Sequence, residues 1–321
     1  MAQPRDDGRP TFTAYGIERR HEKLQDTAWV EQQLNAPITR FLVVCGDKHL
    51  IVEGRAPRSA LLTPDDAAPL LSRADSVTFL GRMNGENYVA LGFDSQEHDV
   101  LLSIAERARF QNLRHVALLA DRCTGGLLAY AQAMTYWHRR HRFCGVCGYP
   151  TESTHGGHLR VCTNPGCETA HFPRTDPAII VLVTHEDRCL LARQPHWPEK
   201  RYSIIAGFVE PVESLEEAVA REVREETGVT LQRVRYHSSQ PWPFPKSLML
   251  GFVAEAADPK IHRNDGELED VRWLSRTALK AALEQGSVVL PSPISISRRL
   301  ITQWFDAGSL GPLDAVRQIG W

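Results

Sequence analysis

The order of strand and helix signals predicts an α/β fold in which a mixed sheet lies between helices. A continuous apolar stretch, AIIVLVT, is typical of a buried strand, and CLLAR follows it as a second strand candidate. We expect strands at 178–184, 189–193, 231–238 and 248–256, and helices at 214–227, 275–284 and 295–306. Strands that alternate with helices in this way form a sheet with helical layers on its faces.

The preceding part of the chain predicts a smaller α+β domain. Residues 1 to about 40 are polar and irregular, with an expected frayed start, and they are followed by strand candidates at 41–45, 77–80 and 88–93. Turn-rich stretches such as Ala56-Pro57-Arg58 and Asn84-Gly85 separate these strands. A helix is expected after Gly125-Gly126, with its core face formed by Leu127, Ala131, Met134 and the adjacent Trp137.

Composition excludes some classes of function. The 321 residues carry a formal net charge of −2, so no global basic field exists and binding to duplex DNA is not expected. No apolar run reaches the length of a membrane span, and the start, MAQPRDDGRP, lacks the layout of a signal peptide. We therefore expect a cytoplasmic protein without membrane partners.

Four of the seven cysteines form two close pairs, Cys144 with Cys147 and Cys162 with Cys167. Such pairs predict a four-thiolate Zn²⁺ site, which would be structural because four sulfur ligands leave no position for water. We expect one Zn²⁺ per chain. Two disulfides or four unrelated core cysteines are the alternatives; the expected compartment opposes the first and the pairing opposes the second. The remaining cysteines are expected to be core thiols: Cys45, Cys123 and Cys189.

The run 207–229, GFVEPVESLEEAVAREVREETGV, contains a helix with clear start and stop signals. Ser214 can cap the helix, Glu217 stands three residues later to complete a capping box, and Gly228 can end it in a left-handed conformation.

Three carboxylates crowd one face of this helix, because Glu222, Glu225 and Glu226 lie at positions i, i+3 and i+4. Clustered carboxylates suit Mg²⁺ or Mn²⁺, hard ions that also bind the phosphate oxygens of a substrate. A solvated acidic face is the alternative interpretation of a glutamate-rich helix.

The segment Ser239–Ser247, SQPWPFPKS, is the second unusual motif. Its alternating prolines predict an extended, polyproline-like segment that cannot join the middle of a sheet. Stiffened in this way, Trp242 and Phe244 could stack on a flat base, with Gln240 and Ser247 available for polar contacts. A proline-rich surface loop, or a ligand for a proline-recognising module, is the alternative.

Taken together, these motifs resemble those of a known family. The glutamate run resembles the Nudix box with every defining position filled, and SQPWPFPxS downstream with the cysteine ribbon upstream resembles the NADH pyrophosphatase branch of the Nudix hydrolases. The resemblance implies an α/β/α sandwich with a mixed sheet, preceded by a zinc ribbon and the α+β domain. We divide the chain into an N-terminal domain (1–140), a ribbon (141–172), a Nudix domain (173–312) and a tail (313–321).

The activity implied by this resemblance is hydrolysis of the pyrophosphate bond of NADH or NAD⁺ to nicotinamide mononucleotide and AMP, and removal of the NAD cap from the 5′ end of RNA. Water would attack a phosphorus with two or three Mg²⁺ or Mn²⁺ ions at the site, in a protein that we expect to be a homodimer. Another Nudix substrate, such as ADP-ribose or a nucleoside triphosphate, is the alternative within enzymes. An inactive Nudix domain that senses nucleotide is a further alternative, which the intact glutamates oppose.

The resemblance also implies roles for individual residues. Glu222 and Glu226 match metal ligands and Glu225 a further metal or base position, while Arg221 would orient these glutamates by bidentate pairing. The carbonyl of Ala206 and the carboxylate of Glu267 match two additional ligand positions, although Asp265, Glu269 and Asp270 near Glu267 leave a solvated acidic cluster as the alternative. The expected substrate contacts are Phe172, Arg114, Ser297 and the loop Gln240, Pro241, Trp242, Pro243, Phe244, Pro245, Lys246 and Ser247.

Overall fold

The computed structural model describes residues 11–54, 57–95, 101, 108–262 and 266–317 and divides the chain into two compact units. The first unit comprises residues 1–175 together with Trp242–Lys246, and the second comprises 176–241 and 247–321. The expected frayed start at 1–10 and the predicted turn residue Ala56 lie outside the described residues. In the described part of the chain, no helix has the length and apolar character of a membrane span.

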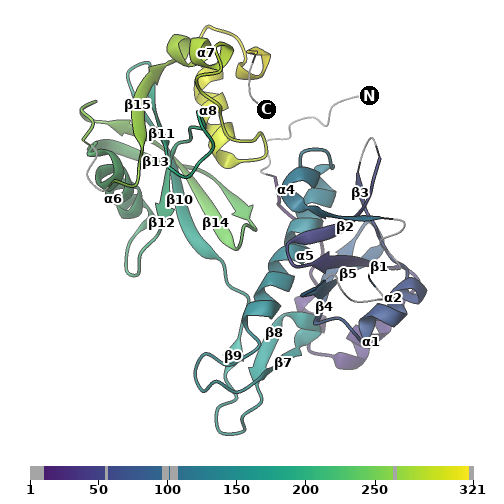
Figure 1. The fold of residues 1–321 in the computed structure, drawn as a ribbon. Coiled ribbons are helices and arrows are strands. Elements are labelled where there is room, and N and C mark those ends of the chain that lie inside the picture. The colour runs from purple at the N-terminus through teal and green to yellow at the C-terminus, as the bar shows by residue number, and fades with distance from the viewer. Residues whose placement is uncertain (1–10, 55–56, 96–100, 102–107, 263–265, 318–321) are drawn as a thin grey trace. The chain divides into compact units, whose positions relative to one another are not determined.

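The first unit contains a six-stranded sheet with the order β3-β2-β1-β5-β4, in which β6 also pairs with β2 (Figure 1). Its strands are β1 (Thr39–Cys45), β2 (Lys48–Val52), β3 (Arg58–Ser59), β4 (Ser76–Met83), β5 (Glu86–Phe93) and β6 (Arg109–Asn112). β1 and β5 are parallel, whereas β4 and β5 form a hairpin. The predicted turn Asn84-Gly85 is confirmed, since both residues have the positive φ that a tight hairpin turn requires.

Helices α1 (Thr27–Leu34), α2 (Pro64–Leu71), α4 (Leu113–Val116) and α5 (Arg122–Arg140) accompany this sheet, with a short 3₁₀ helix at His21–Lys23. α1 corrects the prediction that residues 1 to 40 are irregular. α5 begins before Gly125-Gly126, because Asp121 caps it by accepting a hydrogen bond from the backbone of Thr124. Gly126 permits a close approach to Thr13, whose carbonyl oxygen would lie 2.2 Å from an added Cβ.

The cysteine ribbon is a small three-stranded sheet with the order β7-β8-β9. Its strands are β7 (Thr151–Thr154), β8 (Leu159–Cys162) and β9 (Ala170–His171), and a 3₁₀ turn at His155–Gly157 joins the first two.

The second unit contains a mixed sheet with the order β13-β14-β10-β11-β15, in which β12 also pairs with β10. Its strands are β10 (Asp176–His185), β11 (Arg188–Arg193), β12 (Ile205–Phe208), β13 (Leu231–Trp242), β14 (Ser247–Ala256) and β15 (Asp270–Ser275). Its helices are α6 (Leu215–Thr227), α7 (Arg276–Glu284) and α8 (Ile296–Asp306), followed by a 3₁₀ turn at Leu313–Ala315. The predicted mixed sheet is confirmed, since β10 is parallel to β14 and antiparallel to β11.

The side chains of β10 alternate between two cores. Ile179, Val181 and Val183 belong to the core that includes Val219 and Val223 of α6. Ile180 and Leu182 belong to the opposite core, which is built with α7 and α8. Because successive side chains of a strand point to opposite faces, one continuous apolar strand holds a helical layer on each side of the sheet (Figure 1).

Three details differ from the sequence prediction. Ala206 and Gly207 lie in strand β12, which was not among the expected strands, and Asp270–Ser275 forms an edge strand that was not predicted. Leu313 and Val316, assigned to the tail, are buried in the core with α7 and α8.

Candidate active site

Helix α6 carries the candidate catalytic carboxylates, and its predicted boundaries are confirmed. Ser214 accepts a hydrogen bond from the backbone of Glu217 at 3.3 Å, and Glu217 accepts one from the backbone of Ser214 at 2.9 Å. Gly228 ends the helix with φ 71°. Val219 and Val223, on the inner face of the helix, are fully buried, so packing and capping together fix the position of α6.

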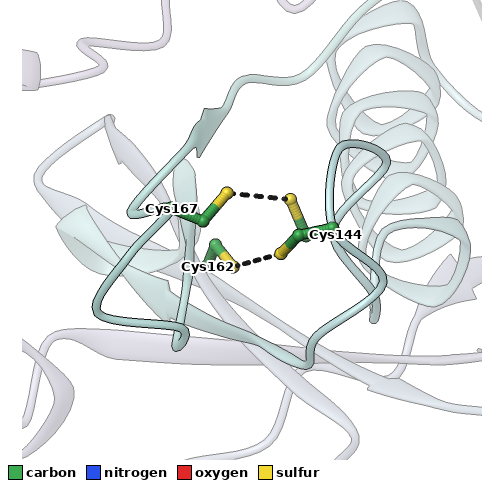
Figure 2. Close-up of side chains that lie close together, drawn as sticks. Cys144, Cys162 and Cys167 are labelled. Carbon is green, nitrogen blue, oxygen red and sulfur yellow. Dashed lines mark hydrogen bonds between the residues drawn. The ribbon is translucent and has the colours of Figure 1, made fainter.

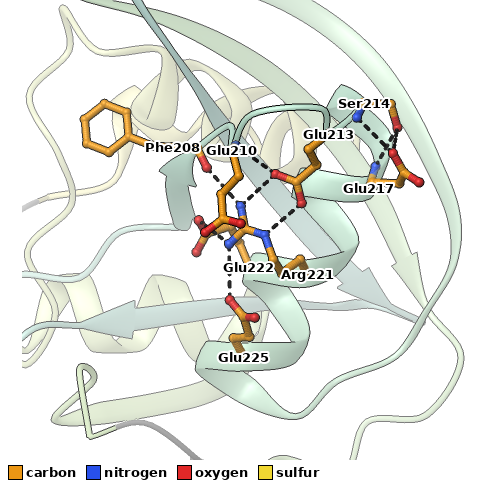
Figure 3. Close-up of polar contacts among 8 residues, drawn as sticks. All are labelled: Phe208, Glu210, Glu213, Ser214, Glu217, Arg221, Glu222 and Glu225. Carbon is orange, nitrogen blue, oxygen red and sulfur yellow. Dashed lines mark hydrogen bonds and ion pairs between the residues drawn. The ribbon is translucent and has the colours of Figure 1, made fainter.

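Arg221 forms five hydrogen bonds, one for each N–H of its guanidinium group (Figure 3). Its Nε and Nη2 donate to the two carboxylate oxygens of Glu213 at 2.7 and 2.9 Å, a bidentate pair. Its Nη1 donates to Glu222 at 2.9 Å and to Glu225 at 3.1 Å, and Nη2 also donates to the carbonyl of Phe208 at 2.9 Å. The Arg221 guanidinium group thus hydrogen-bonds to three carboxylates and to the carbonyl at the end of β12.

The carboxylates of α6 occupy different environments. Glu226 is 5% exposed, whereas the Glu225 side chain is 51% exposed and the Glu222 side chain 14%. Burial raises the pKa of Glu222 above its ordinary value, the hydrogen bond and charge of Arg221 oppose this rise, and the charges of Glu225 and Glu267 add to it. Arg221 lowers the pKa of Glu213 by hydrogen bonding. The cluster therefore carries excess negative charge, which favours a cation.

Glycine at position 207 lets Glu222 lie against strand β12. A Cβ added at Gly207 would lie 1.9 Å from the Oε1 atom of Glu222, far inside any permitted contact. Gly207 pairs with Ile179 of β10, and its neighbour Ala206 pairs with Ile180, so the sheet fixes this backbone. The role of the Ala206 carbonyl as a ligand stays a prediction.

Glu267 lies in the segment before β15, close enough for its charge to act on Glu222. Its neighbour Leu268 is 5% exposed and belongs to the core under α6, while Glu269 forms an ion pair with Arg193 and donates its backbone N–H to the Arg193 carbonyl at 2.9 Å. The charge of Glu267 thus reaches Glu222, while the role of Glu267 as a metal ligand stays a prediction. Asp265 lies outside the described residues, and Asp270 pairs with Arg272 and Tyr202.

The segment Trp242–Lys246, here called the aromatic loop, comprises the last residue of β13 and the turn into β14, and it belongs to the first unit. Within that unit, Trp242 and Phe244 lie edge to face at 5.2 Å, and Phe12 contacts both rings edge to face at 5.8 and 5.5 Å. The guanidinium of Arg114 lies 4.0 Å from the Phe244 ring centre and 5.3 Å from that of Trp242. The structure thus brings Arg114 together with the aromatic loop, but both aromatic rings already have protein partners.

Two predicted substrate contacts have other partners. The expectation that the Gln240 amide is available is wrong, since this residue is 1% exposed, donates to the Ile294 carbonyl and accepts from the Ile296 backbone, each at 2.7 Å. Ser297 is 4% exposed and its hydroxyl lies 2.8 Å from the Ser203 hydroxyl.

The predicted polyproline-like segment is corrected in part, because residues 239–242 complete strand β13. β13 lies at the sheet edge, where Pro241 is tolerated.

The four predicted zinc ligands converge. The Sγ atoms of Cys144, Cys147, Cys162 and Cys167 all lie within 4.8 Å of one another, and all four cysteines are free thiols (Figure 2). Four thiols at this spacing fit a tetrahedral Zn²⁺ site, and none of these four cysteines forms a disulfide in the structure. The Nε2 atom of His171 lies 3.3 Å from the Cys144 sulfur, a contact that cysteine spacing gave no reason to expect.

Phe172 and the three cysteines outside the zinc cluster differ in their exposure to solvent. Phe172 is 57% exposed, consistent with a surface contact. Cys45 and Cys189 are buried as predicted, and burial raises the pKa of each thiol, to about 11 and about 12. Cys123 is exposed, so its assignment to the core is wrong.

Sequence reasoning missed Glu213 as the main partner of Arg221 and Phe12 as a partner of the aromatic loop. The spacing of Glu213 in the box offered a signal for the first. Phe12 lies in a polar segment, and nothing in its sequence context links it to a loop more than two hundred residues away.

Comparison with known families agrees with this geometry along most of the chain. A NUDIX domain matches residues 174–290, an NADH pyrophosphatase zinc ribbon domain matches 139–172, and an NADH pyrophosphatase-like rudimentary NUDIX domain matches 38–137. The combination of fold, carboxylate helix and ribbon is that of a Nudix hydrolase.

Curated relatives resemble this chain over much of its length. A protein of Mycobacterium bovis named NAD-capped RNA hydrolase NudC is 39% identical over 79% of this chain and 82% of its own length. NAD-capped RNA hydrolase NudC of Stutzerimonas stutzeri is 46% identical over 60% of this chain and 67% of its own, and NAD-capped RNA hydrolase NUDT12 of Macaca fascicularis is 30% identical over 91% and 72%. The chain belongs to the NADH pyrophosphatase branch of the Nudix hydrolase family, which confirms the resemblance found in the sequence.

Proposed function

We propose that this enzyme hydrolyses the pyrophosphate bond of NADH and NAD⁺ to nicotinamide mononucleotide and AMP, and removes the NAD cap from the 5′ end of RNA. The observation that carries the proposal is the α6 cluster, in which Arg221 holds Glu222 and Glu225 beside the buried Glu226. The relatives named NAD-capped RNA hydrolase support the choice of substrate.

The donor set fits Mg²⁺ or Mn²⁺, since it consists of carboxylates with excess negative charge and the raised pKa of Glu222 reports that charge together with burial. We propose that Glu222, Glu225, Glu226, Glu267 and the Ala206 carbonyl hold two or three such ions. When bound, a divalent cation polarises phosphate oxygens and lowers the pKa of an attacking water.

The protein's own contribution is orientation and charge. Arg221 has a partner for each of its five donors, so it acts on the carboxylates rather than on the substrate. Among Glu222, Glu225 and Glu226, Glu225 is the most exposed to solvent, which suits a proton acceptor. For the substrate we propose contacts from Phe172, Arg114 and the aromatic loop.

Product analysis tests this function. Purified enzyme is incubated with NADH, NAD-capped RNA, triphosphate RNA and ADP-ribose, with Mg²⁺ or Mn²⁺, and Glu222→Gln serves as the inactive control. We expect AMP and nicotinamide mononucleotide from NADH, and 5′-monophosphate RNA from capped RNA. Preferred cleavage of ADP-ribose would contradict the substrate assignment, and tight nucleotide binding without any cleavage would identify a sensor.

We also propose one structural Zn²⁺ per chain at the cysteine cluster, a homodimer, and a cytoplasmic location without duplex DNA as a partner. The free thiols of the cluster suit a reducing compartment. Elemental analysis of zinc and light scattering of the purified protein test the first two of these proposals.

A further inference from the structure

Gln132 is a buried amide of α5 whose two ends both have partners inside the first unit. The residue is 5% exposed, its Nε2 donates to the Pro243 carbonyl at 2.6 Å, and its Oε1 lies 3.2 Å from Nε2 of His49. Since a carbonyl oxygen only accepts, the amide nitrogen must face Pro243 and the amide oxygen must face His49.

His49 completes this arrangement as a neutral donor. It lies on β2 with no exposed surface, and burial lowers its pKa to about 4, so the ring is uncharged at neutral pH. The single ring proton then resides on Nε2, where it can be donated to Gln132. A chain of hydrogen bonds therefore runs from the sheet of the first unit through α5 to the aromatic loop.

The aromatic loop needs a hydrogen-bond donor from outside because its own residues supply few backbone N–H groups. Pro243 and Pro245 have no N–H, and the N–H of Phe244 is donated to the Trp242 carbonyl at 2.8 Å. Pro243 is buried, and a buried carbonyl without a donor is costly. Gln132 provides the donor at the residue between the two aromatic rings.

We propose that Gln132 is a positioning residue for substrate recognition: its amide fixes the backbone of the aromatic loop so that Trp242 and Phe244 hold the base of an NAD-like substrate. Phe12 and Arg114 contact the same two rings, so the first unit fixes both the backbone and the rings of the loop. This inference rests on the proposed function. It gives the rudimentary Nudix-like domain a role in specificity.

The test replaces Gln132 by Met, which has a similar length and no hydrogen-bonding amide. We expect the KM for NADH to rise about tenfold with kcat changed less than about threefold, because a looser loop weakens base stacking and leaves the α6 carboxylates intact. Calorimetry with AMP and with nicotinamide mononucleotide should show a matching loss of affinity for at least one of them. Met134→Ala, also buried on α5, controls for general destabilisation of the helix.

A double-mutant cycle separates positioning from mere stability. If Gln132 acts through the loop, the double variant should have a KM less than about twofold above that of Trp242→Ala. If the two substitutions act independently, their separate factors on KM should multiply. An unchanged KM in Gln132→Met, full multiplication in the cycle, or an equal rise in Met134→Ala would each overturn the proposal. Failure of the wild-type enzyme to cleave NADH would refute the proposed function instead, and the nucleotide-binding measurements would still test Gln132.

Discussion

Replacing Arg221 by Lys keeps the positive charge of the carboxylate cluster but removes its geometry. Lysine offers three donors on a single nitrogen, so at least two of the five hydrogen bonds of Arg221 are lost, including the bidentate pair with Glu213. A hydrogen bond to a charged group is worth about 1.5–3 kcal/mol, which gives an upper limit of about 3–6 kcal/mol for two. Because these side chains are 12 to 51% exposed and water replaces part of the loss, we expect about 1–3 kcal/mol of destabilisation.

The effect on activity should be larger than this loss of stability suggests. Glu222 and Glu225 both depend on Arg221 for orientation, and residues that orient metal ligands typically change metal affinity or activity by about 10- to 100-fold. We expect kcat with NADH to fall by that factor, and the half-saturating Mn²⁺ concentration to rise.

The assay is a Mn²⁺ titration of NADH hydrolysis at a temperature well below the Tm of the variant, with Mn²⁺ binding followed independently by electron paramagnetic resonance. Arg224→Lys, on an exposed position of the same helix, is the matched control and should change stability by less than about 0.5 kcal/mol. Wild-type kcat and Mn²⁺ affinity in Arg221→Lys would refute the view that its five hydrogen bonds organise the site.

Three further predictions concern the metal sites and the substrate. Glu222→Gln and Glu226→Gln should each lower kcat at least about 100-fold, roughly 3 kcal/mol, as expected for a lost metal ligand. Because the pKa of Glu222 is raised, its ionised form costs stability above that pKa, so Glu222→Gln should leave the Tm without metal unchanged or higher; near-normal turnover would contradict the assignment. Cys144→Ser should abolish stoichiometric zinc and lower the Tm and solubility, and a folded, reduced wild type without zinc would argue against the site. Phe172→Ala and Trp242→Ala should lower kcat/KM for NADH and capped RNA by about ten- to a hundredfold, whereas triphosphate RNA should be a poor substrate throughout; unchanged kinetics in both variants would rule out base stacking.

Local signals explain which parts of the fold the sequence predicted well. The Ser214 cap, the Glu217 capping box and the Gly228 stop are contacts within a few residues, and all three are present in the structure. The four cysteines converge, as their grouping into two close pairs predicts, although four residues rather than two separate Cys162 from Cys167.

The structure differs from the sequence prediction where contacts between residues far apart in the chain determine the local structure. Strand β12 contains Ala206-Gly207, a pair that local propensity assigns to a loop, and pairing with β10 overrides that propensity. Gln240 has the composition of a ligand-binding side chain, yet Ile294 and Ile296, more than fifty residues away, bind both ends of its amide. No pattern within a short window of sequence contains these partners.

The contact between Gly207 and Glu222 shows that a site can depend on the absence of atoms. A single methyl group at position 207 would lie where the Glu222 carboxylate now lies, so that carboxylate would have to move. If Glu222 holds metal as proposed, we expect Gly207→Ala to lower activity although every carboxylate of the cluster is retained. Position 207 thus contributes no functional group to the cluster, but only the space that the Glu222 carboxylate occupies.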